Sequence, residues 1–251
     1  MRSKWEALAR GERLIGSFLS TGYPVNAELV GMAGFDFVII DLEHGMSAER
    51  DILGQLHALE TTGTTGLVRV ESHEKQRVHR ILDLGAKGIM FPRVESADQA
   101  RACVAAMRYP PRGVRGVATM IRASGYGRDY EGYRDSSEAE LITILQIESA
   151  EGVRNVEQIA AVEGAGVLFI GPMDLSTSLG VFRQYDHPLF VDAVEKTVSA
   201  AKRHGRPLGI LLGSPADLPR WDALGFRMIT CGTDTLLIKK AAAEMAAALR
   251  G

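Results

Sequence analysis

The stretch FDFVIIDLEHG, residues 35–45, decides how the rest of this chain folds. Its run of apolar residues shows no alternation, which is typical of a strand that is covered on both faces of a parallel sheet. The run ends directly in three ionisable side chains, those of Asp41, Glu43 and His44. In parallel α/β folds, the carboxyl ends of the strands are where binding and catalytic groups gather. The stretch therefore predicts a buried strand that carries polar groups into a site.

Similar apolar runs recur along the whole chain. They cover residues 14–19, 37–41, 66–70, 88–92, 141–148, 166–171, 207–213 and 227–232. Amphipathic helical patterns lie between them, and Gly85, Gly205 and Gly225 each close one of these patterns, as glycines after helices do. Eight strands and about eight helices predict an α/β fold, a (β/α)8 TIM barrel forming a single domain over residues 1–251. A doubly wound open sheet is the structural alternative, but eight regular units in a chain of this size favour closure.

The composition is that of an ordinary globular protein. The chain has 251 residues, a net charge of -2, 46% hydrophobic residues and 24% charged residues, so neither nucleic acid nor an anionic membrane is expected as a partner. The two cysteines, Cys103 and Cys231, are expected to be free thiols in a reducing compartment. The sequence contains neither an apolar run of about 18 residues nor the pattern of a signal peptide. These features predict a cytoplasmic protein.

The segment 108–138 interrupts the alternation with a long stretch rich in Gly, Arg and Tyr. We interpret it as a loop insertion, with either a binding or interface role or no role beyond the solvated surface. Five of its arginines favour carboxylate binding or subunit contact over nucleic acid, because the chain has no net positive charge: Arg108, Arg112, Arg115, Arg122 and Arg128.

Two carboxylates follow neighbouring strands of the predicted barrel. Glu148 ends the fifth strand and Asp174 lies just beyond the sixth, and adjacent strands are about 4.8 Å apart. Carboxylates so close repel unless they are protonated or bridged by a cation. Oxygen ligands with open positions suit Mg²⁺, Mn²⁺ or Co²⁺, whereas no Cys/His cluster has the spacing of a structural zinc site. The alternative is that each carboxylate caps a helix.

Further polar groups accompany this pair at the predicted strand ends. Arg69, inside GLVRV, is expected to offset negative charge on a substrate oxygen, or else to form a structural ion pair. His44 can exchange protons near neutral pH, or else serves as a hydrogen-bonded structural histidine. The turn GPMDLSTS is typical of backbone N–H groups that hold a small carboxylate. Because no lysine ends a predicted strand, a Schiff-base mechanism is not expected.

Five motifs carry a family resemblance when they are taken together and in order. The chain resembles, over essentially its whole length, the HpcH/HpaI aldolase family of metal-dependent (class II) pyruvate aldolases. The motifs that carry the resemblance are FVIIDLEHG, VRV, RYPPRGVRGV, LQIES and FIGPMDLSTSLG. The resemblance implies a (β/α)8 barrel, a hexamer built as a trimer of dimers, and C-terminal helices that are exchanged between dimer partners. It also implies reversible cleavage of 4-hydroxy-2-oxoacids to pyruvate, or a close 2-oxoacid such as hydroxypyruvate, and an aldehyde.

The resemblance assigns roles to individual residues. It implies that Glu148 and Asp174 bind the metal, that His44 is the catalytic acid/base, and that Arg69 stabilises the enolate. Asp41 joins the candidate catalytic group at the end of its strand, and Asp83 matches an aspartate that raises the basicity of the histidine. The implied contacts to the ketoacid and to the aldehyde come from Gln146, Gly171, Pro172, Met173, Asp174, Phe18 and Leu212.

The chain departs from the family pattern at three of these positions. Leu42 and Met173 replace smaller residues of many relatives, and Phe18 replaces a tryptophan, which puts the donor pocket and the aldehyde preference in question. Two other functions remain open: a CoA-ester lyase of the malyl-CoA or citramalyl-CoA type, and a ligand-binding barrel without catalysis. Activity on a free 2-oxoacid distinguishes the aldolase from the CoA-ester lyase, and metal-dependent turnover distinguishes it from a binding protein.

Overall fold

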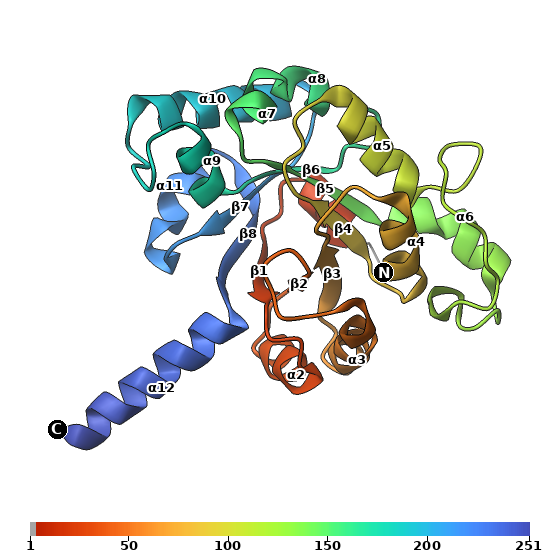
Figure 1. Cartoon of the computed structure of the whole chain (residues 1–251), viewed down its shortest axis with the longest axis horizontal. Coiled ribbons are helices and arrows are strands. Elements are labelled where there is room, and N and C mark those ends of the chain that lie inside the picture. The colour runs from red at the N-terminus through yellow and green to blue at the C-terminus, as the bar shows by residue number, and fades with distance from the viewer. Residues whose placement is uncertain (1–3) are drawn as a thin grey trace.

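The eight apolar runs form a closed barrel in the computed structural model, which describes residues 4–251 (Figure 1). All neighbouring strands are parallel, they follow one another in chain order, and β1 pairs with β8 to close the barrel. The strands are β1 (Leu14–Leu19), β2 (Phe37–Asp41), β3 (Thr65–Arg69), β4 (Gly88–Phe91), β5 (Ile142–Ile147), β6 (Val167–Ile170), β7 (Leu208–Leu212) and β8 (Phe226–Thr233). The predicted TIM barrel is confirmed, and the doubly wound alternative is excluded.

Alternate strand residues face the barrel interior and the surrounding helices, because successive side chains of a strand point to opposite faces. The inward side chains form one apolar cluster that includes Phe37, Leu67 and Phe169. Gly16 and Gly209 lie beside the rings of Phe37 and Phe169, where a β-carbon would collide with the ring. Small residues in the inner layer thus admit large neighbours, and the barrel is filled beneath its carboxyl-end rim.

The helices cover the outside of the barrel and pack on a larger apolar cluster formed with the outward side chains. Ser96 and Ser149 cap two of them by accepting hydrogen bonds from backbone N–H groups. The helices are α1 (Lys4–Ala9), α2 (Pro24–Met32), α3 (Glu49–Glu60), α4 (Lys75–Asp83), α5 (Ala97–Met107), α6 (Tyr130–Glu140), α7 (Ala150–Arg154), α8 (Val156–Ala160), α9 (Pro172–Ser178), α10 (Pro188–Arg203), α11 (Leu218–Ala223) and α12 (Asp234–Arg250), with short 3-10 turns η1 (Arg122–Ser124) and η2 (Pro215–Asp217).

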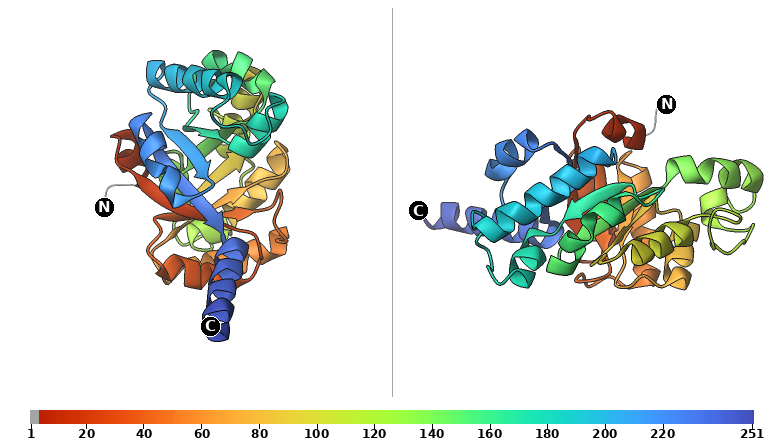
Figure 2. Two further views of the ribbon diagram at one scale, coloured as in Figure 1. Left: turned by 90° about the vertical axis from the view of Figure 1, so that its left-hand side faces the viewer. Right: turned by 90° about the horizontal axis from the view of Figure 1, so that it is seen from above.

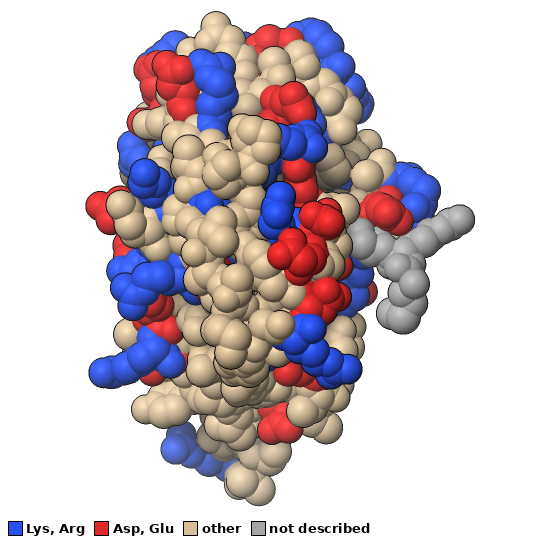
Figure 3. Space-filling model, turned by 90° about the vertical axis from the view of Figure 1, so that its right-hand side faces the viewer, with Lys and Arg blue, Asp and Glu red and all other residues tan. Residues whose placement is uncertain are grey.

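The segment 108–138 is only partly a loop, because α6 begins at Tyr130 within it. Arg108 and Arg112 pair with Glu138, and Arg122 pairs with Glu60, so these arginines bind carboxylates of their own chain. On the face that includes α6, basic and acidic side chains are interspersed around a strip of uncharged residues (Figure 3). Within one chain, these three arginines therefore bind carboxylates of neighbouring elements.

The C-terminal helix α12 projects away from the barrel (Figure 1, Figure 2). Buried Asp234 holds its start by accepting hydrogen bonds from the backbone N–H groups of Ser20 and Thr21. Beyond that residue the helix is exposed, including the apolar side chains of Leu236, Ile238 and Met245. Within residues 4–251, none of the helices combines the length and the apolarity that crossing a bilayer requires.

Candidate active site

An arginine and an aspartate form a buried pair at the carboxyl ends of β2 and β3. Asp41 and Arg69 are register partners on the two strands. Arg69 donates from Nε to Asp41 Oδ1 over 2.9 Å and from Nη2 to Asp41 Oδ2 over 2.7 Å. The guanidinium also lies 5.0 Å from the centroid of the Phe18 ring. This two-point geometry fixes the plane of the guanidinium group.

Glu43 adds a second carboxylate to this pair. Its Oε2 lies 2.9 Å from Arg69 Nη1 and 4.0 Å from His44 Nε2. Burial raises the pKa of Glu43, opposed by the Arg69 and His44 charges and reinforced by those of Asp41 and Asp174. Glu43 follows the same strand end, but its residue type and position alone predict no role for it. Its spacing from Asp41 is the signal that points to it, because side chains two residues apart along a strand point to the same side.

His44 lies at the rim of this group. Its side chain is 67% exposed, and its backbone N–H donates to Asp41 Oδ1 over 3.3 Å. The N–H of Glu43 donates to the same oxygen over 3.0 Å. Asp41 therefore both orients Arg69 and shapes the turn that carries Glu43 and exposes His44 to solvent.

Glu148 is the most enclosed carboxylate of the site, with 3% of its surface exposed. Oε1 accepts the backbone N–H of Arg93 over 2.8 Å, and Oε2 accepts Gln146 Nε2 over 2.9 Å. Burial raises the pKa of Glu148 to about 7, and the nearby charges of Glu43 and Asp174 act in the same direction. The Arg93 N–H and the Arg69 charge oppose this shift.

The junction between β6 and the first turn of α9 consists of Gly171, Pro172, Met173 and Asp174. A β-carbon on Gly171 would lie 2.5 Å from Glu148 Oε2, so the absence of a side chain lets β6 approach this carboxylate. Asp174 and Met173 are exposed, and Asp174 is near enough to influence the pKa values of both Glu43 and Glu148. The structure thus brings the two predicted metal ligands to the same rim.

The donor set fits a divalent cation. The site holds four carboxylates, those of Asp41, Glu43, Glu148 and Asp174, around the partly buried cation of Arg69, so a bound positive charge would offset their repulsion. Gln146 Oε1 is buried and has no hydrogen-bond partner, which leaves an oxygen free beside Glu148. No group of three His, Cys, Asp or Glu residues within the described part of the chain could by itself hold a metal ion. Two protein carboxylates with positions left for substrate and water match this arrangement.

A cavity of about 270 Å³ adjoins the site between β7, β8, α9 and α11. Met173, Leu211, Leu212 and Trp221 are among its lining residues. Leu212, predicted to form the aldehyde wall, packs in the outer cluster, whereas Leu211 packs against the inward-facing one. Leu211 is thus the residue that faces the barrel interior, because neighbouring strand residues point to opposite faces. Phe18, the other predicted wall residue, is buried beneath Arg69.

Asp83 is not brought to this group within one chain. It lies at the C-terminal end of α4, next to the turn that leads into the start of β4, whereas His44 follows the end of β2. Its Oδ1 lies 2.7 Å from Nη2 of Arg115, a fully buried guanidinium that also donates to the Tyr133 hydroxyl. In this structure Asp83 therefore anchors the segment 108–138 and does not contact His44.

Comparisons with known proteins identify the family of this chain. A family model described as HpcH/HpaI aldolase/citrate lyase matches residues 14–241. The 5-keto-4-deoxy-D-glucarate aldolase of Klebsiella pneumoniae subsp. pneumoniae is 36% identical over 244 residues, 97% of this chain and 95% of that protein. The 2-dehydro-3,6-dideoxy-6-sulfogluconate aldolase of Pseudomonas putida is 37% identical over the same coverage.

Solved structures show the same likeness over the full length. A HpcH/HpaI aldolase/citrate lyase family protein from Burkholderia cenocepacia J2315 superposes with a TM-score of 0.94 at 36% identity, covering 100% of both chains. The HpcH/HpaI aldolase from Desulfitobacterium hafniense DCB-2 gives 0.92 at 28% identity, covering 100% of this chain and 97% of that one. The chain therefore belongs to the HpcH/HpaI aldolase/citrate lyase family.

Proposed function

We propose that the protein is a divalent-metal-dependent aldolase that reversibly cleaves 4-hydroxy-2-oxoacids to pyruvate, or a close 2-oxoacid such as hydroxypyruvate, and an aldehyde. The chain is a carbon–carbon lyase of the aldolase type, as its relatives are. The observation that carries the finer proposal is the buried carboxylate of Glu148, next to Asp174 and an unpaired Gln146 oxygen. A site that only bound a neutral ligand would have no use for this excess of negative charge.

Glu148 and Asp174 would hold the divalent ion, which is Mg²⁺, Mn²⁺ or Co²⁺ from the oxygen chemistry of the donors. When bound, such an ion supplies Lewis-acid polarisation of the keto oxygen of the substrate. The start of α9, at Gly171, Pro172 and Met173, lies next to Glu148, in a position to contact the ketoacid. Gln146 offers its free Oε1 and holds Glu148 through its amide nitrogen.

Arg69 stabilises the negative charge that develops on the keto oxygen. Three of the five N–H groups of a guanidinium face Asp41 and Glu43 here, which leaves two for the substrate. Asp41 holds the guanidinium in one plane, so the remaining N–H groups point in a fixed direction. This is electrostatic stabilisation by a preorganised donor.

His44 moves the proton of the reaction. In the cleavage direction it takes the proton of the 4-hydroxyl group, the C3–C4 bond breaks as the C4 carbonyl forms, and the bond electrons pass into the enolate of the 2-oxoacid. Protonation of C3 then gives pyruvate. In synthesis the enolate carbon attacks the aldehyde and His44 returns a proton to the new alkoxide. The exposed imidazole lies beside Glu43 at the rim of the site, and histidine is the side chain most often used for such proton transfer.

The relatives suggest the class of substrate. The Klebsiella and Pseudomonas enzymes are named for keto sugar acids, so a role in sugar-acid catabolism is the first to test; catabolism of aromatic compounds is the second. The cavity lined by Met173, Leu211 and Trp221 adjoins the site and would receive the aldehyde part. Its walls are apolar apart from the ends of a few polar side chains, such as Arg220 and Asp217.

Retro-aldol turnover tests the proposal. The protein is treated with EDTA, and cleavage of several 4-hydroxy-2-oxoacids is followed by pyruvate release before and after single divalent ions are restored. We expect turnover that disappears with the chelator and returns with Mg²⁺, Mn²⁺ or Co²⁺. Cleavage of a malyl-CoA or citramalyl-CoA ester, without cleavage of free acids, would support the CoA-ester lyase instead. No metal-dependent turnover of any of these compounds would leave only the binding function.

The exposed apolar face of α12 supports a homo-oligomer, for which the family resemblance implies a hexamer with exchanged C-terminal helices. This helix touches its own barrel only at its start. About half or more of the surface is exposed at each of four apolar residues along it: Leu236, Ile238, Met245 and Leu249. Light scattering after size-exclusion chromatography should show an oligomer for the wild type. Ile238→Glu should reduce the mass toward that of one chain, and an unchanged mass would contradict this role of α12.

A further inference from the structure

The connection between β4 and α5, residues 92–95, has an unusual backbone next to the candidate site. Arg93 has a φ of +46°, in the left-handed region that residues with a side chain avoid. Its N–H, aimed by this conformation, is the group that donates to Glu148 Oε1 over 2.8 Å. Strained backbone of this kind persists only where surrounding contacts hold it, and it is concentrated at functional sites.

Neighbouring elements hold this turn from several directions. His73 Nε2 donates to the carbonyl oxygen of Pro92 over 2.6 Å, and the N–H of Val94 donates to the carbonyl oxygen of Gln146 over 3.0 Å. Asn155 Nδ2 donates to the carbonyl oxygen of Glu95 over 2.7 Å. Each of these three bonds comes from a different part of the chain, namely the β3–α4 connection, β5 and the α7–α8 junction.

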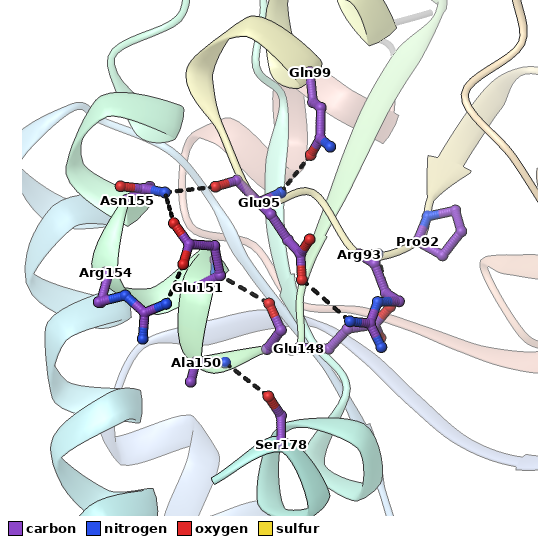
Figure 4. A network of polar contacts seen from close by, with 12 residues as sticks. Pro92, Arg93, Glu95, Gln99, Glu148, Ala150, Glu151, Arg154, Asn155 and Ser178 are labelled. Carbon is purple, nitrogen blue, oxygen red and sulfur yellow. Dashed lines mark hydrogen bonds and ion pairs between the residues drawn. The ribbon is translucent and has the colours of Figure 1, made fainter.

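Asn155 is itself fixed, as Figure 4 shows by its contacts with both Glu95 and Glu151. Its Nδ2 lies 2.8 Å from Glu151 Oε1. Helix α7 also approaches the turn closely at Gly152, where a β-carbon would lie 2.9 Å from the carbonyl oxygen of Val94. The turn is thus clamped against α7 and cannot rotate without losing several hydrogen bonds.

We propose that residues 92–95 are a positioning device for the Glu148 carboxylate, with His73 and Asn155 as the positioning residues that hold the device. The inference rests on the proposed function, in which Glu148 binds the metal. The terminal torsion of a glutamate is broad, so burial alone does not define the direction of its two oxygens. The Arg93 N–H on Oε1 and the Gln146 amide on Oε2 together define it. His73 and Asn155 bond to the backbone of the turn, not to the Glu148 carboxylate, and they act through that backbone.

The experiment measures Mn²⁺ affinity of the free protein by electron paramagnetic resonance, which needs no turnover. His73→Ala and Asn155→Ala each remove one bond to the turn, and each should weaken Mn²⁺ binding by about tenfold, the effect typical of residues that orient metal ligands. His73→Gln keeps an N–H donor and should recover most of the affinity. Asn26→Ala is the matched control, because it removes an amide hydrogen bond to Thr21 that lies outside this turn; its Mn²⁺ affinity should stay within twofold of the wild type.

The two positioning residues are tested independently, so either variant decides if the other does not fold. A folded His73→Ala or Asn155→Ala protein that binds Mn²⁺ within twofold of the wild type would overturn the inference, even if its melting temperature falls. A wild-type protein that binds no Mn²⁺ would overturn the metal assignment, and this inference with it. The two failures are therefore distinguished by the wild-type measurement alone.

Discussion

Replacing Gly171 by alanine should disable the site without requiring any change of backbone conformation. Gly171 has φ -94° and ψ 94°, which alanine adopts freely, so the need for glycine here is one of space. The new methyl carbon would lie 2.5 Å from Glu148 Oε2 and 3.3 Å from Glu148 Cβ. An ordinary carbon–oxygen contact is about 3.4 Å, slightly shorter than the 3.5–4.0 Å optimum for carbon pairs. Because the methyl carbon would be roughly 1 Å closer than that to Glu148 Oε2, either the carboxylate or β6 must move by roughly 1 Å.

A displacement of about 1 Å at a reacting centre can cost roughly 100-fold in rate. We therefore expect kcat/KM of Gly171→Ala to fall by about two orders of magnitude and Mn²⁺ binding to weaken. The overpacking should also lower the free energy of unfolding by about 1–3 kcal/mol. The assays are retro-aldol kinetics, Mn²⁺ titration and thermal melting.

Gly116→Ala is the matched control, because its nearest neighbour to an added β-carbon, His79 Nδ1, is 3.7 Å away, an ordinary contact. Its kinetics and Mn²⁺ affinity should equal those of the wild type. A folded Gly171→Ala protein with wild-type turnover and wild-type Mn²⁺ affinity would refute the close approach of β6 to Glu148 as a requirement of the site.

Three further perturbations have expected outcomes. His44→Ala should lower kcat by about 10²–10⁴-fold, the usual contribution of an acid/base group, with Mn²⁺ affinity unchanged; equal turnover would remove His44 from the mechanism. Because the pKa of Glu148 is raised to about 7, the protonated carboxyl is the form that folding favours, so the metal-free protein should lose stability as pH rises from about 4.5 through 7. Mn²⁺ binding should tighten over the same range, and Glu148→Gln should abolish both pH effects, as melting curves and titrations would show. Arg115→Ala should lower the free energy of unfolding by about 3 kcal/mol, because it leaves Asp83 without its buried partner and removes the cation from the Tyr109 ring at 4.6 Å; a melting temperature equal to that of the wild type would contradict this anchor.

The barrel strands were readable from the sequence because their signal is local. Each buried strand is a short unbroken apolar run, and the runs at 14–19 and 37–41 coincide with β1 and β2. Helix α2 carries no comparable local signal. Its apolar residues are spread around the helix, with Val30 buried but Val25 and Leu29 exposed, so no amphipathic period marks it. Helix α6, inside the predicted loop, is composed mostly of polar residues, so the sequence pattern does not mark it as a buried element.

The candidate site was predictable where strand ends carry unusual polar residues, as at Asp41, Arg69 and Glu148. Glu43 received no role because its importance depends on its distances from Arg69 and His44. Leu212, the predicted wall residue, and its neighbour Leu211 both line the adjoining cavity, and motif alignment alone does not show which of the two faces the barrel interior.

By itself, the sequence determined the eight strands, their parallel order and the polar character of their carboxyl ends, because hydrophobic periodicity and strand-end chemistry are written in neighbouring residues. Only the tertiary structure decided which polar groups meet. Arg69 is held by two carboxylates, Glu148 is held by the N–H of a strained turn, and Asp83 pairs with Arg115 away from His44. These contacts join residues from different barrel units, and their distances depend on how the strands are staggered and closed, which no local pattern specifies.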